Sequence, residues 1–286
     1  MGLPVVDFNE YRTQYTNVHI CIACSAKYVL EIKRQLEEAG IIEYSIFDVS
    51  KDLVKDRLVS YAGSSDAEDV ILYHVLKKEP EIFYIDVGCN DPFLNSVSKL
   101  FYDMKNAHGI NIDPQSKLME IVQRERPRDI NLTVALGAEK GRQRLYFQGG
   151  RSTLVEGHVT EAAQSSADVE VVTLADVCEK YVNPEQDIHF LKIDVEGYEE
   201  QVLKGADFQR YRPWVLCIES TLPGTDEPSW EGWEPLVISA GYELALMSGV
   251  NRYYVAKEHK ELDPRFLPLE QLREQYMIYQ ARFVAE

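Results

Sequence analysis

The stretch KIDVEGYEEQVLKG, which runs from Lys192 to Gly205, decides the fold predicted for this chain. Apolar and charged residues alternate up to Asp194, a glycine then interrupts the pattern, and a helical pattern follows. This order predicts a buried strand that ends at Asp194, a glycine turn and a helix. In open α/β sheets ligands bind beyond the carboxyl ends of the strands, so Asp194 and Glu196 mark a candidate site.

The composition excludes several classes of protein. The chain has 286 residues and a formal net charge of −17, whereas a surface that follows a phosphate backbone needs clustered Lys and Arg. No apolar run reaches the roughly 18 to 20 residues that a membrane span needs, and the amino terminus lacks the basic-then-apolar order of a secretion signal. The sequence therefore predicts a cytoplasmic protein that binds no nucleic acid and has no transmembrane segment.

Five cysteines in a chain of this length do not form a disulfide framework. Cys21 and Cys24 have the spacing of a metal or redox pair, but they lie in VHICIAC, which is typical of a strand. Residues three apart in a strand point to opposite faces, so the two sulfurs would diverge. The sequence has no second cysteine pair to complete a zinc site. We therefore expect structural thiols in a reducing compartment.

Three segments are predicted along the chain. Residues 1–60 contain a strand, NVHICIACS, an amphipathic helix that ends at Gly40, and a second strand, EYSIFD, which together form a small βαβ extension. Residues 61–260 form the α/β body. Residues 261–286, with PLEQLREQYMIYQARF, are predicted as a C-terminal helical segment that packs on an edge.

In the body, short strands rich in Val, Ile and Leu alternate with helices, which is the pattern of a parallel sheet covered on both faces. One helix is predicted to begin near Ser65 or Asp66, whose side chains cap well, and to end at Pro80. Another is predicted over 115–125. The predicted strands are 82–88, 107–113, 130–136, 188–194, 213–220, 242–247 and 252–257.

Acidic residues end several of these strands, at the edge of the sheet where ligands bind. Asp86 closes the first strand of the body, and Gly88 removes the side chain where a ligand would meet the backbone. Asp113 ends the second strand, where a carboxylate can accept from both hydroxyls of a ribose. Asp194 and Glu219 end the fourth and fifth strands. Together these residues predict a pocket for a ribose-bearing cofactor.

Two other classes of protein share parts of this pattern. An NAD-binding or nucleotide-sugar-modifying enzyme would have the sheet and the ribose carboxylate, but the sequence lacks the G-x-G-x-x-G phosphate loop. A non-catalytic module that binds a cofactor or a glycosyltransferase partner in a glycan-assembly system would keep the pocket between Asp86 and Asp113. Such a module would not need Asp194 or Glu219.

Successive blocks of the sequence between about Glu81 and Glu258 resemble the FkbM-type S-adenosylmethionine-dependent methyltransferases. The blocks are FYIDVGCN, GINIDP, VALG, STLVEGH, VVTLADV, FLKIDVEGYEEQVLKGADF and PWVLCIES. The resemblance implies a class I methyltransferase (Rossmann-like) fold: a seven-stranded, mostly parallel sheet with an antiparallel last pair and helices on both faces. It also implies O-methylation of a sugar hydroxyl in a surface polysaccharide, a glycolipid or a glycosylated small molecule. The chain departs from the family at Cys89, where Ala is usual, and in the DPFL that follows.

The resemblance also gives roles to residues of the acidic edge. S-adenosylmethionine carries a sulfonium cation, an ammonium and a ribose, so an acidic rim suits it electrostatically. The cofactor-binding residues predicted in this way are Asp86, Gly88 and Asn90 at the methionine portion, Asp113 at the ribose, Ala135 and Leu136 at the adenine, and Asp194 near the methyl group.

Two mechanisms stay open for the transfer. Asp194 and Glu219 end neighbouring strands in this fold, and two carboxylates in one partly dry site repel each other. They could hold a divalent cation such as Mg²⁺, which would lower the pKa of the acceptor hydroxyls. In the alternative, transfer is metal-free and a base takes the proton. His158 is the preferred base, because it lies in a polar loop between strands; a solvated loop histidine is the other interpretation.

Acceptor contacts are predicted in the loops RSTLVEGH, STLPGTDEPSW and GVNRYY, which project near the rim. The residues that could hydrogen-bond to a sugar or stack on it are Arg151, Ser152, Thr153, Glu196, Trp230, Asn251 and Arg252. Glu196 has a second interpretation as a carboxylate at the amino end of the following helix. The candidate partners are a glycan or small-molecule acceptor, a glycosyltransferase and a second copy of the chain.

Overall fold

The computed structural model describes residues 20–22, 34, 44–46, 58–62, 66–104, 107–161, 163 and 165–278. The chain divides into two units, Met1–Lys55 with Gln280–Glu286, and Asp56–Tyr279. In the first unit, β1 (Ile20–Ile22) and β2 (Tyr44–Ile46) pair in parallel, where the sequence predicts the two strands of the extension. The helix predicted between them lies outside the described residues, apart from Arg34, which is helical, and so does Cys24. The predicted segment boundaries at residues 60 and 260 stay predictions.

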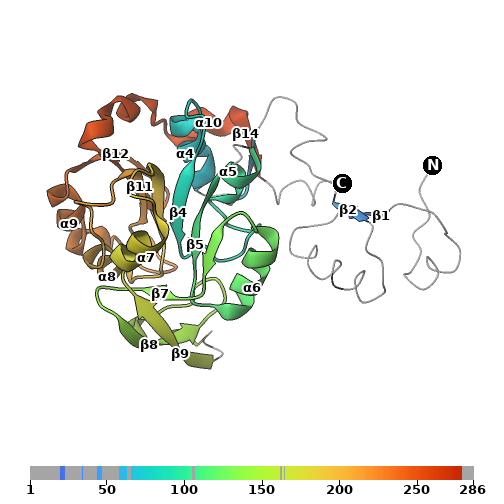
Figure 1. Ribbon diagram of the computed structural model, residues 1–286, viewed down its shortest axis with the longest axis vertical. Helices are drawn as coiled ribbons and strands as arrows, with labels where there is room; N and C mark the ends of the chain where they lie inside the picture. Colours follow the sequence, from blue (N-terminus) through green and yellow to red (C-terminus); the bar gives the residue numbers. More distant parts are fainter. Residues whose placement is uncertain are drawn as a thin grey trace, which may run out of the picture. The chain divides into compact units, whose positions relative to one another are not determined.

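The second unit is built on a seven-stranded sheet with the order β12-β13-β11-β10-β4-β5-β6 (Figure 1). β13 runs antiparallel to both of its neighbours, and the other neighbouring pairs are parallel. This arrangement confirms the predicted mostly parallel sheet with an antiparallel last pair. The strands are β4 (Phe83–Val87), β5 (His108–Ile112), β6 (Ile130–Leu132), β10 (Ile188–Ile193), β11 (Pro213–Glu219), β12 (Tyr242–Ser248) and β13 (Asn251–Ala256).

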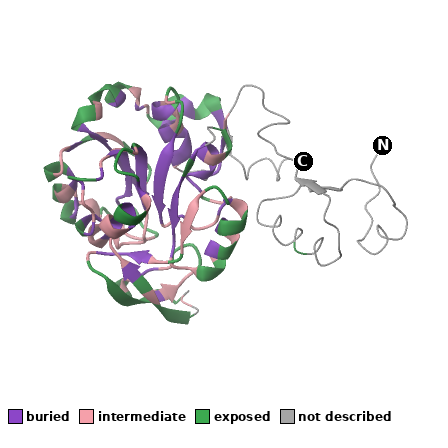
Figure 2. Ribbon diagram, in the orientation of Figure 1, coloured by how far each residue is buried: buried purple, intermediate pink, exposed green. Residues whose placement is uncertain are grey.

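Both faces of this sheet are covered, and alternate residues of its strands enter two separate cores. On β10, for example, Leu191 packs in one core and Phe190 in the other. Figure 2 shows the central strands as buried and the outer sides of the surrounding helices as exposed. The first core includes residues of α7 (Leu174–Tyr181), α8 (Glu199–Lys204) and α9 (Glu234–Ser239), and the second includes residues of α4 (Glu68–Leu76) and α5 (Lys99–Met104). Among the described residues, no helix is both long and apolar enough to cross a membrane.

The predicted strand 130–136 is divided between two sheets, which corrects the prediction of one continuous strand. β6 stays beside β5, but β5 ends at Ile112 and the nearby Pro114 has no amide hydrogen, so the chain beyond Leu132 has no partner there. Residues 135–136 pair with another strand instead. The resulting three-stranded sheet, which the sequence analysis did not predict, consists of β7 (Ala135–Leu136), β9 (Ser165–Val172) and β8 (Gly141–Phe147), in that order.

The sequence predicts a C-terminal helical segment, but the structure does not form one helix there. The segment contains a 3-10 segment η3 (Lys257–Arg265), a short helix α10 (Leu269–Leu272), a 3-10 turn η4 (Arg273–Gln275) and a strand β14 (Tyr276–Ile278). β14 pairs in parallel with β3 (Leu58–Ser60). The sequence Tyr-Met-Ile favours a strand, and β3 offers an edge with unpaired backbone groups, so pairing replaces a further helical turn.

The start of α4 also differs from the prediction. Its N-cap is Ala67, which has a left-handed backbone with φ of 40° and makes no side-chain cap. Asp66 does not cap the helix, because its Oδ1 accepts a hydrogen bond from the amide of Val250 at 3.2 Å. Ser65 lies outside the described residues. Elsewhere, α6 (Ser116–Glu125) matches the helix predicted over 115–125.

Candidate active site

A cavity of about 530 Å³ lies at the carboxyl ends of β4, β5 and β10. Its volume is in the range of sites that bind small molecules and cofactors. The structure brings many of the predicted site residues to this cavity, and leaves others outside it. Those that line it are Gly88, Asn90, Asp113, Ala135, Leu136, Arg151, Ser152, His158, Asp194 and Glu196. Those that do not are Asp86, Thr153, Glu219, Trp230, Asn251 and Arg252.

The turn after β4 lies directly against the backbone that follows β10. Gly88 has φ of 76°, and a Cβ built on it would lie 1.8 Å from the carbonyl oxygen of Asp194. Both the conformation and the space therefore require glycine at this position. The amides of Gly88 and Cys89 donate to the carbonyl of Ile112, at 2.9 and 3.2 Å, which ties the same turn to the end of β5. The three strand ends that surround the cavity are thus held together through this turn.

Asp113 presents its carboxylate to the cavity from the end of β5. Oδ1 accepts from the amide of Gln115 at 2.9 Å, and Oδ2 accepts from the amide of Asn90 at 3.2 Å. Burial raises the pKa of Asp113 to about 6, while these two amides act in the opposite direction. Each carboxylate oxygen has further lone pairs, so the group can still accept from ligand hydroxyls. Apolar side chains of Ala135 and Leu136 lie in the same cavity.

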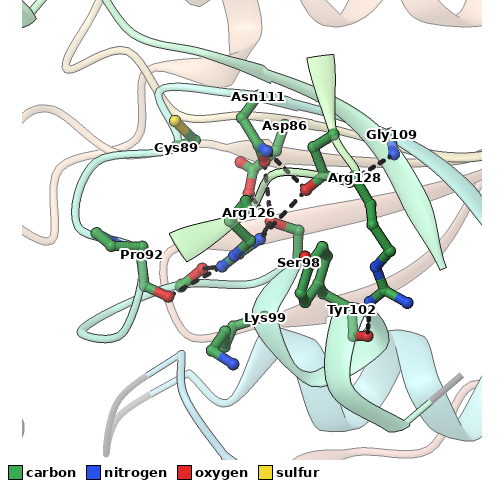
Figure 3. A network of polar contacts seen from close by, with 12 residues as sticks. Asp86, Cys89, Pro92, Ser98, Lys99, Tyr102, Gly109, Asn111, Arg126 and Arg128 are labelled. Carbon is green, nitrogen blue, oxygen red and sulfur yellow. Dashed lines mark hydrogen bonds and ion pairs between the residues drawn. The ribbon is translucent and has the colours of Figure 1, made fainter. Parts of the chain in front are cut away.

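Asp86 belongs to a buried polar network behind the cavity, which corrects its predicted contact with the cofactor (Figure 3). Its Oδ2 accepts from the hydroxyl of Ser98 at 2.6 Å, and Ser98 in turn accepts from Nη1 of Arg126 at 2.9 Å. Nη2 of Arg126 donates to the carbonyl of Pro92 at 3.0 Å. Arg126 therefore fixes the loop in which DPFL departs from the family pattern. No local sequence signal identified this arginine, because its partners lie about thirty residues earlier in the chain.

The D-V-E-G turn contains two successive residues with left-handed backbones, Glu196 with φ of 55° and Gly197 with φ of 93°. Oε1 of Glu199 accepts from the amides of Val195 at 3.0 Å and Gly197 at 3.2 Å, and so holds the turn. Glu196 does not cap the following helix, whose N-cap is Tyr198. The carboxylate that satisfies the free amides is that of Glu199, which the sequence analysis missed. A glutamate placed three residues after Glu196, at the start of a helix, is the signal that could have identified it.

The main-chain carbonyl of Glu196 anchors one wall of the cavity. Oγ1 of Thr153 donates to it at 2.9 Å, and Nδ1 of His158 lies 3.4 Å from it. Thr153 is buried in this role and does not reach the cavity, unlike its neighbour Ser152. The His158 tautomer with a proton on Nδ1 donates to this carbonyl and leaves a lone pair on Nε2. His158 is therefore oriented by the backbone and not simply solvated.

Several carboxyl groups gather near the D-V-E-G turn, and the pKa values of Glu196 and Glu219 are raised there. Burial, followed by the charges of Asp194 and Glu199, raises the pKa of Glu196 to about 8. Burial and the neighbouring carboxylates, with Asp194 first among them, raise the pKa of Glu219 far above its usual value. Oε2 of Glu219 is buried and has no hydrogen-bond partner among the described residues. Glu219 is therefore a neutral group behind the cavity at pH 7, and its predicted direct role in catalysis is not supported.

The predicted Mg²⁺ site is not supported either. Within the described ranges, no three or more His, Cys, Asp and Glu side chains are grouped so that they could hold a metal ion. Oδ2 of Asp194 instead lies 3.2 Å from Nζ of Lys192. A protonated Glu219 outside the cavity would also be a poor ligand for a hard cation.

The predicted acceptor residues of the last loop have other partners. Nδ2 of Asn251 donates to Oε1 of Glu68 at 2.9 Å, inside the protein. The guanidinium of Arg252 bonds to Glu234 at 2.7 Å and lies over the ring of Trp230, 3.9 Å from its centroid. This set of contacts stabilises the edge of the sheet. The polar lining residues that have no predicted role in the site are Asn95, Gln115, Gln148, Thr160, Lys192 and Tyr198.

The model of the methyltransferase FkbM domain matches residues 86–244. No curated protein matches the chain. A solved structure, a TehB-like SAM-dependent methyltransferase from Corynebacterium glutamicum, is 10% identical; the match covers 81% of this chain and 97% of that one, with a TM-score of 0.37. Because the domain model spans more than half of the 286 residues, the chain belongs to the FkbM methyltransferase family, whose cofactor is S-adenosylmethionine.

Proposed function

We propose that the cavity binds S-adenosylmethionine and that the protein transfers its methyl group to a hydroxyl of a sugar or glycosylated acceptor. One observation supports this proposal above all: Asp113, the glycine turn at Gly88 and Asp194 line a single cavity, although they follow three different strands. The family gives the cofactor and the type of group transferred. The acceptor and the residues that act on it are our proposal.

The lining residues fit the parts of the cofactor in the predicted order. The carboxylate of Asp113 would accept from the ribose hydroxyls, and Ala135 and Leu136 would contact the adenine. Gly88 and Asn90 would hold the methionine portion, where the absent side chain of Gly88 lets a ligand approach the backbone. Asp86 would act only indirectly, through the loop that its network supports.

The carboxylate of Asp194, beside the D-V-E-G turn, would favour the cationic part of the cofactor. S-adenosylmethionine supplies an electrophilic methyl group on a sulfonium cation. The carboxylate of Asp194 is about one third exposed, at 35%, and faces the cavity, so it can interact with a positive charge there. Asp194 lies next to Gly88, and in this proposal the acceptor enters on the Asp194 side of the cavity.

His158 is the base in this proposal. Its Nδ1 lies toward the carbonyl of Glu196, and Nε2 is then free to take the proton from the acceptor hydroxyl. The hydroxyl oxygen would form the new bond to the methyl carbon while the bond from that carbon to the sulfonium sulfur breaks; its proton would move to Nε2, and S-adenosylhomocysteine would leave. Arg151, Ser152 and Glu196 line the same cavity and would orient the acceptor. This transfer needs no metal ion.

The first prediction concerns the cofactor itself. Native mass spectrometry of the purified protein should show S-adenosylmethionine or S-adenosylhomocysteine bound to it, and calorimetric titration with S-adenosylhomocysteine should give one site per chain. The ribose carboxylate and the glycine turn provide the physical reason. Bound NAD, or no binding of S-adenosylhomocysteine in the titration, would contradict the proposed site.

The second prediction tests the close contact at Gly88. Gly88→Ala places a Cβ 1.8 Å from the carbonyl oxygen of Asp194 on a left-handed backbone, so the turn must shift. We expect the affinity for S-adenosylhomocysteine, measured by calorimetry, to fall at least about tenfold. The matched control is Gly141→Ala, whose Cβ meets nothing within 4 Å and which should bind as the wild type does. Equal affinities of both variants would refute the contact.

The third prediction is a pH dependence. Because burial raises the pKa of Asp113 to about 6, lowering the pH through 6 protonates the carboxylate that accepts from the ribose. We expect the affinity for S-adenosylhomocysteine to be full above pH 7 and to fall about tenfold by pH 5. Asp113→Asn should bind weakly at both values, with little change between them. A wild-type affinity that is independent of pH would count against this role of Asp113.

The fourth prediction concerns the base. His158→Gln should lose most of the turnover, by about a hundredfold or more, and keep its affinity for S-adenosylhomocysteine, because Nε2 acts on the acceptor alone. Turnover is measured as release of S-adenosylhomocysteine with a panel of glycans and glycosylated small molecules.

The control for this variant is His108→Gln, at an exposed position on β5 and outside the cavity. It should retain turnover, and EDTA should leave the turnover of the wild type unchanged. Unchanged turnover of His158→Gln would remove this residue from the mechanism. A protein that binds the cofactor but modifies no acceptor would instead match the non-catalytic module.

A further inference from the structure

We propose that Lys192 is a positioning residue of the cofactor site, whose ammonium joins the turn after β4 to the turn after β10. This inference rests on the proposed cofactor site, but it concerns a residue to which none of the predicted cofactor, acceptor or catalytic roles is assigned. It assigns to Lys192 no contact with the reacting atoms. Lys192 acts through Gly88 and Asp194.

The geometry around the ammonium is specific. Nζ of Lys192 donates to the carbonyl oxygen of Gly88 at 2.9 Å and lies 3.2 Å from Oδ2 of Asp194. A third oxygen, Oδ1 of Asp86, lies 3.7 Å away. An ammonium has three hydrogens to donate, so one group can serve the two turns and the buried carboxylate together. The side chain of Lys192 is only 5% exposed, although it reaches the cavity.

Lys192 is also central in a row of polar residues that crosses the sheet. It pairs in register with Asp86 on β4 and with Cys217 on β11. The row continues from Asp86 to Asn111 on β5 and from Cys217 to Tyr253 on β13. Neighbours in register point to the same face of a sheet, so the side chains of this row lie together on one face, close to the strand ends. Lys192 is its cation, between the carboxylate of Asp86 on β4 and that of Asp194, which follows β10.

A cation close to a site for a cationic cofactor needs a physical reason. The carboxylate of Asp86 is fully buried, and its Oδ1 has no hydrogen-bond partner within the part of the chain that the structure describes. Burial alone would favour an uncharged lysine, but Asp194 and Asp86 outweigh it and raise the pKa of Lys192 above its usual value. The charge of Lys192 is therefore balanced by these groups. Lys192 holds the two carboxylates in place, and their negative charges reduce its repulsion of a cationic ligand.

The turn after β4 depends on the bond from Lys192, because Gly88 has no side chain that could anchor the turn. Gly88 must lack a Cβ, since the carbonyl of Asp194 occupies that space. The amide of Gly88 bonds to Ile112, and Lys192 holds the carbonyl of Gly88 from β10. The same ammonium sets the direction of the Asp194 carboxylate. One side chain thus adds to the backbone bond from Asp194 to Val87 in fixing the relative position of the two turns.

The experiment uses Lys192→Met, which keeps an apolar stem of similar length and removes the ammonium. We expect the dissociation constant for S-adenosylhomocysteine, measured by calorimetry, to rise about tenfold or more, because charge-assisted bonds to both turns are lost. Hydrogen exchange of the protein without ligand should become faster in peptides that cover Gly88 and Asp194. Exchange in β11 should not change.

Two further variants separate positioning from a general loss of stability. Cys217→Ala is the matched control, because Cys217 is the neighbour of Lys192 in register and is fully buried, but belongs to neither turn. It should lower the melting temperature and leave the affinity unchanged. Lys192→Met alone leaves the buried negative charge of Asp86 without its cation. Adding Asp86→Asn removes that negative charge and so restores the balance of buried charge. This double variant should fold and still bind S-adenosylhomocysteine weakly.

Three results would overturn the inference. They are wild-type affinity in the double variant, exchange that rises equally in β11 and in the turns, and an equal loss of affinity in Cys217→Ala. If the wild-type protein itself does not bind S-adenosylhomocysteine, the proposed function fails. The exchange of the two turns then still decides whether Lys192 positions them.

Discussion

The contact between the glycine turn after β4 and the backbone after β10 is the constraint on which the rest of the site depends. Neighbouring parallel strands end at the same edge, and here the ends approach until a Cβ at Gly88 would lie 1.8 Å from the carbonyl oxygen of Asp194. A third strand, β5, joins the same turn through Ile112. The cavity exists because these three strand ends are fixed together, with Asp113 and Asp194 on either side of the glycine.

The acidic edge has two layers with different tasks. Asp113, Asp194 and Glu196 face the cavity, where the negative charges of Asp113 and Asp194 suit a cationic ligand. Asp86 and Glu219 lie behind it and are buried. Unpaired negative charges on Asp86 and Glu219 would be unstable in the interior, and the two groups avoid this in different ways. Asp86 is bonded to Ser98 and lies near Lys192, whereas the pKa of Glu219 is raised so far that the group stays neutral at pH 7.

Sequence periodicity was enough to predict the sheet, its mostly parallel character and the strand ends that carry Asp113 and Asp194. It could not show which of these carboxyl groups reaches the cavity, because the pattern places both Asp86 and Asp113 at strand ends, whereas Asp86 lies inside β4, in register with Asn111, and Asp113 lies beyond β5. Arg126 and the β8–β9 pairing were missed since their partners are distant in the chain. The strand Tyr276–Ile278 shows the same limit: its partner β3 lies far upstream in the chain, and pairing with it replaces a helix.

The wall that bears His158 is attached to the D-V-E-G turn through a main-chain oxygen, that of Glu196. Every amino acid carries that oxygen, so the attachment survives any substitution that tolerates the left-handed conformation. The side chain at position 196 can therefore vary while Thr153 and His158 keep their bond partner. Because this side chain lines the cavity, directed evolution toward other acceptors has here, under the proposed function, a position whose variation leaves the attachment of the wall intact.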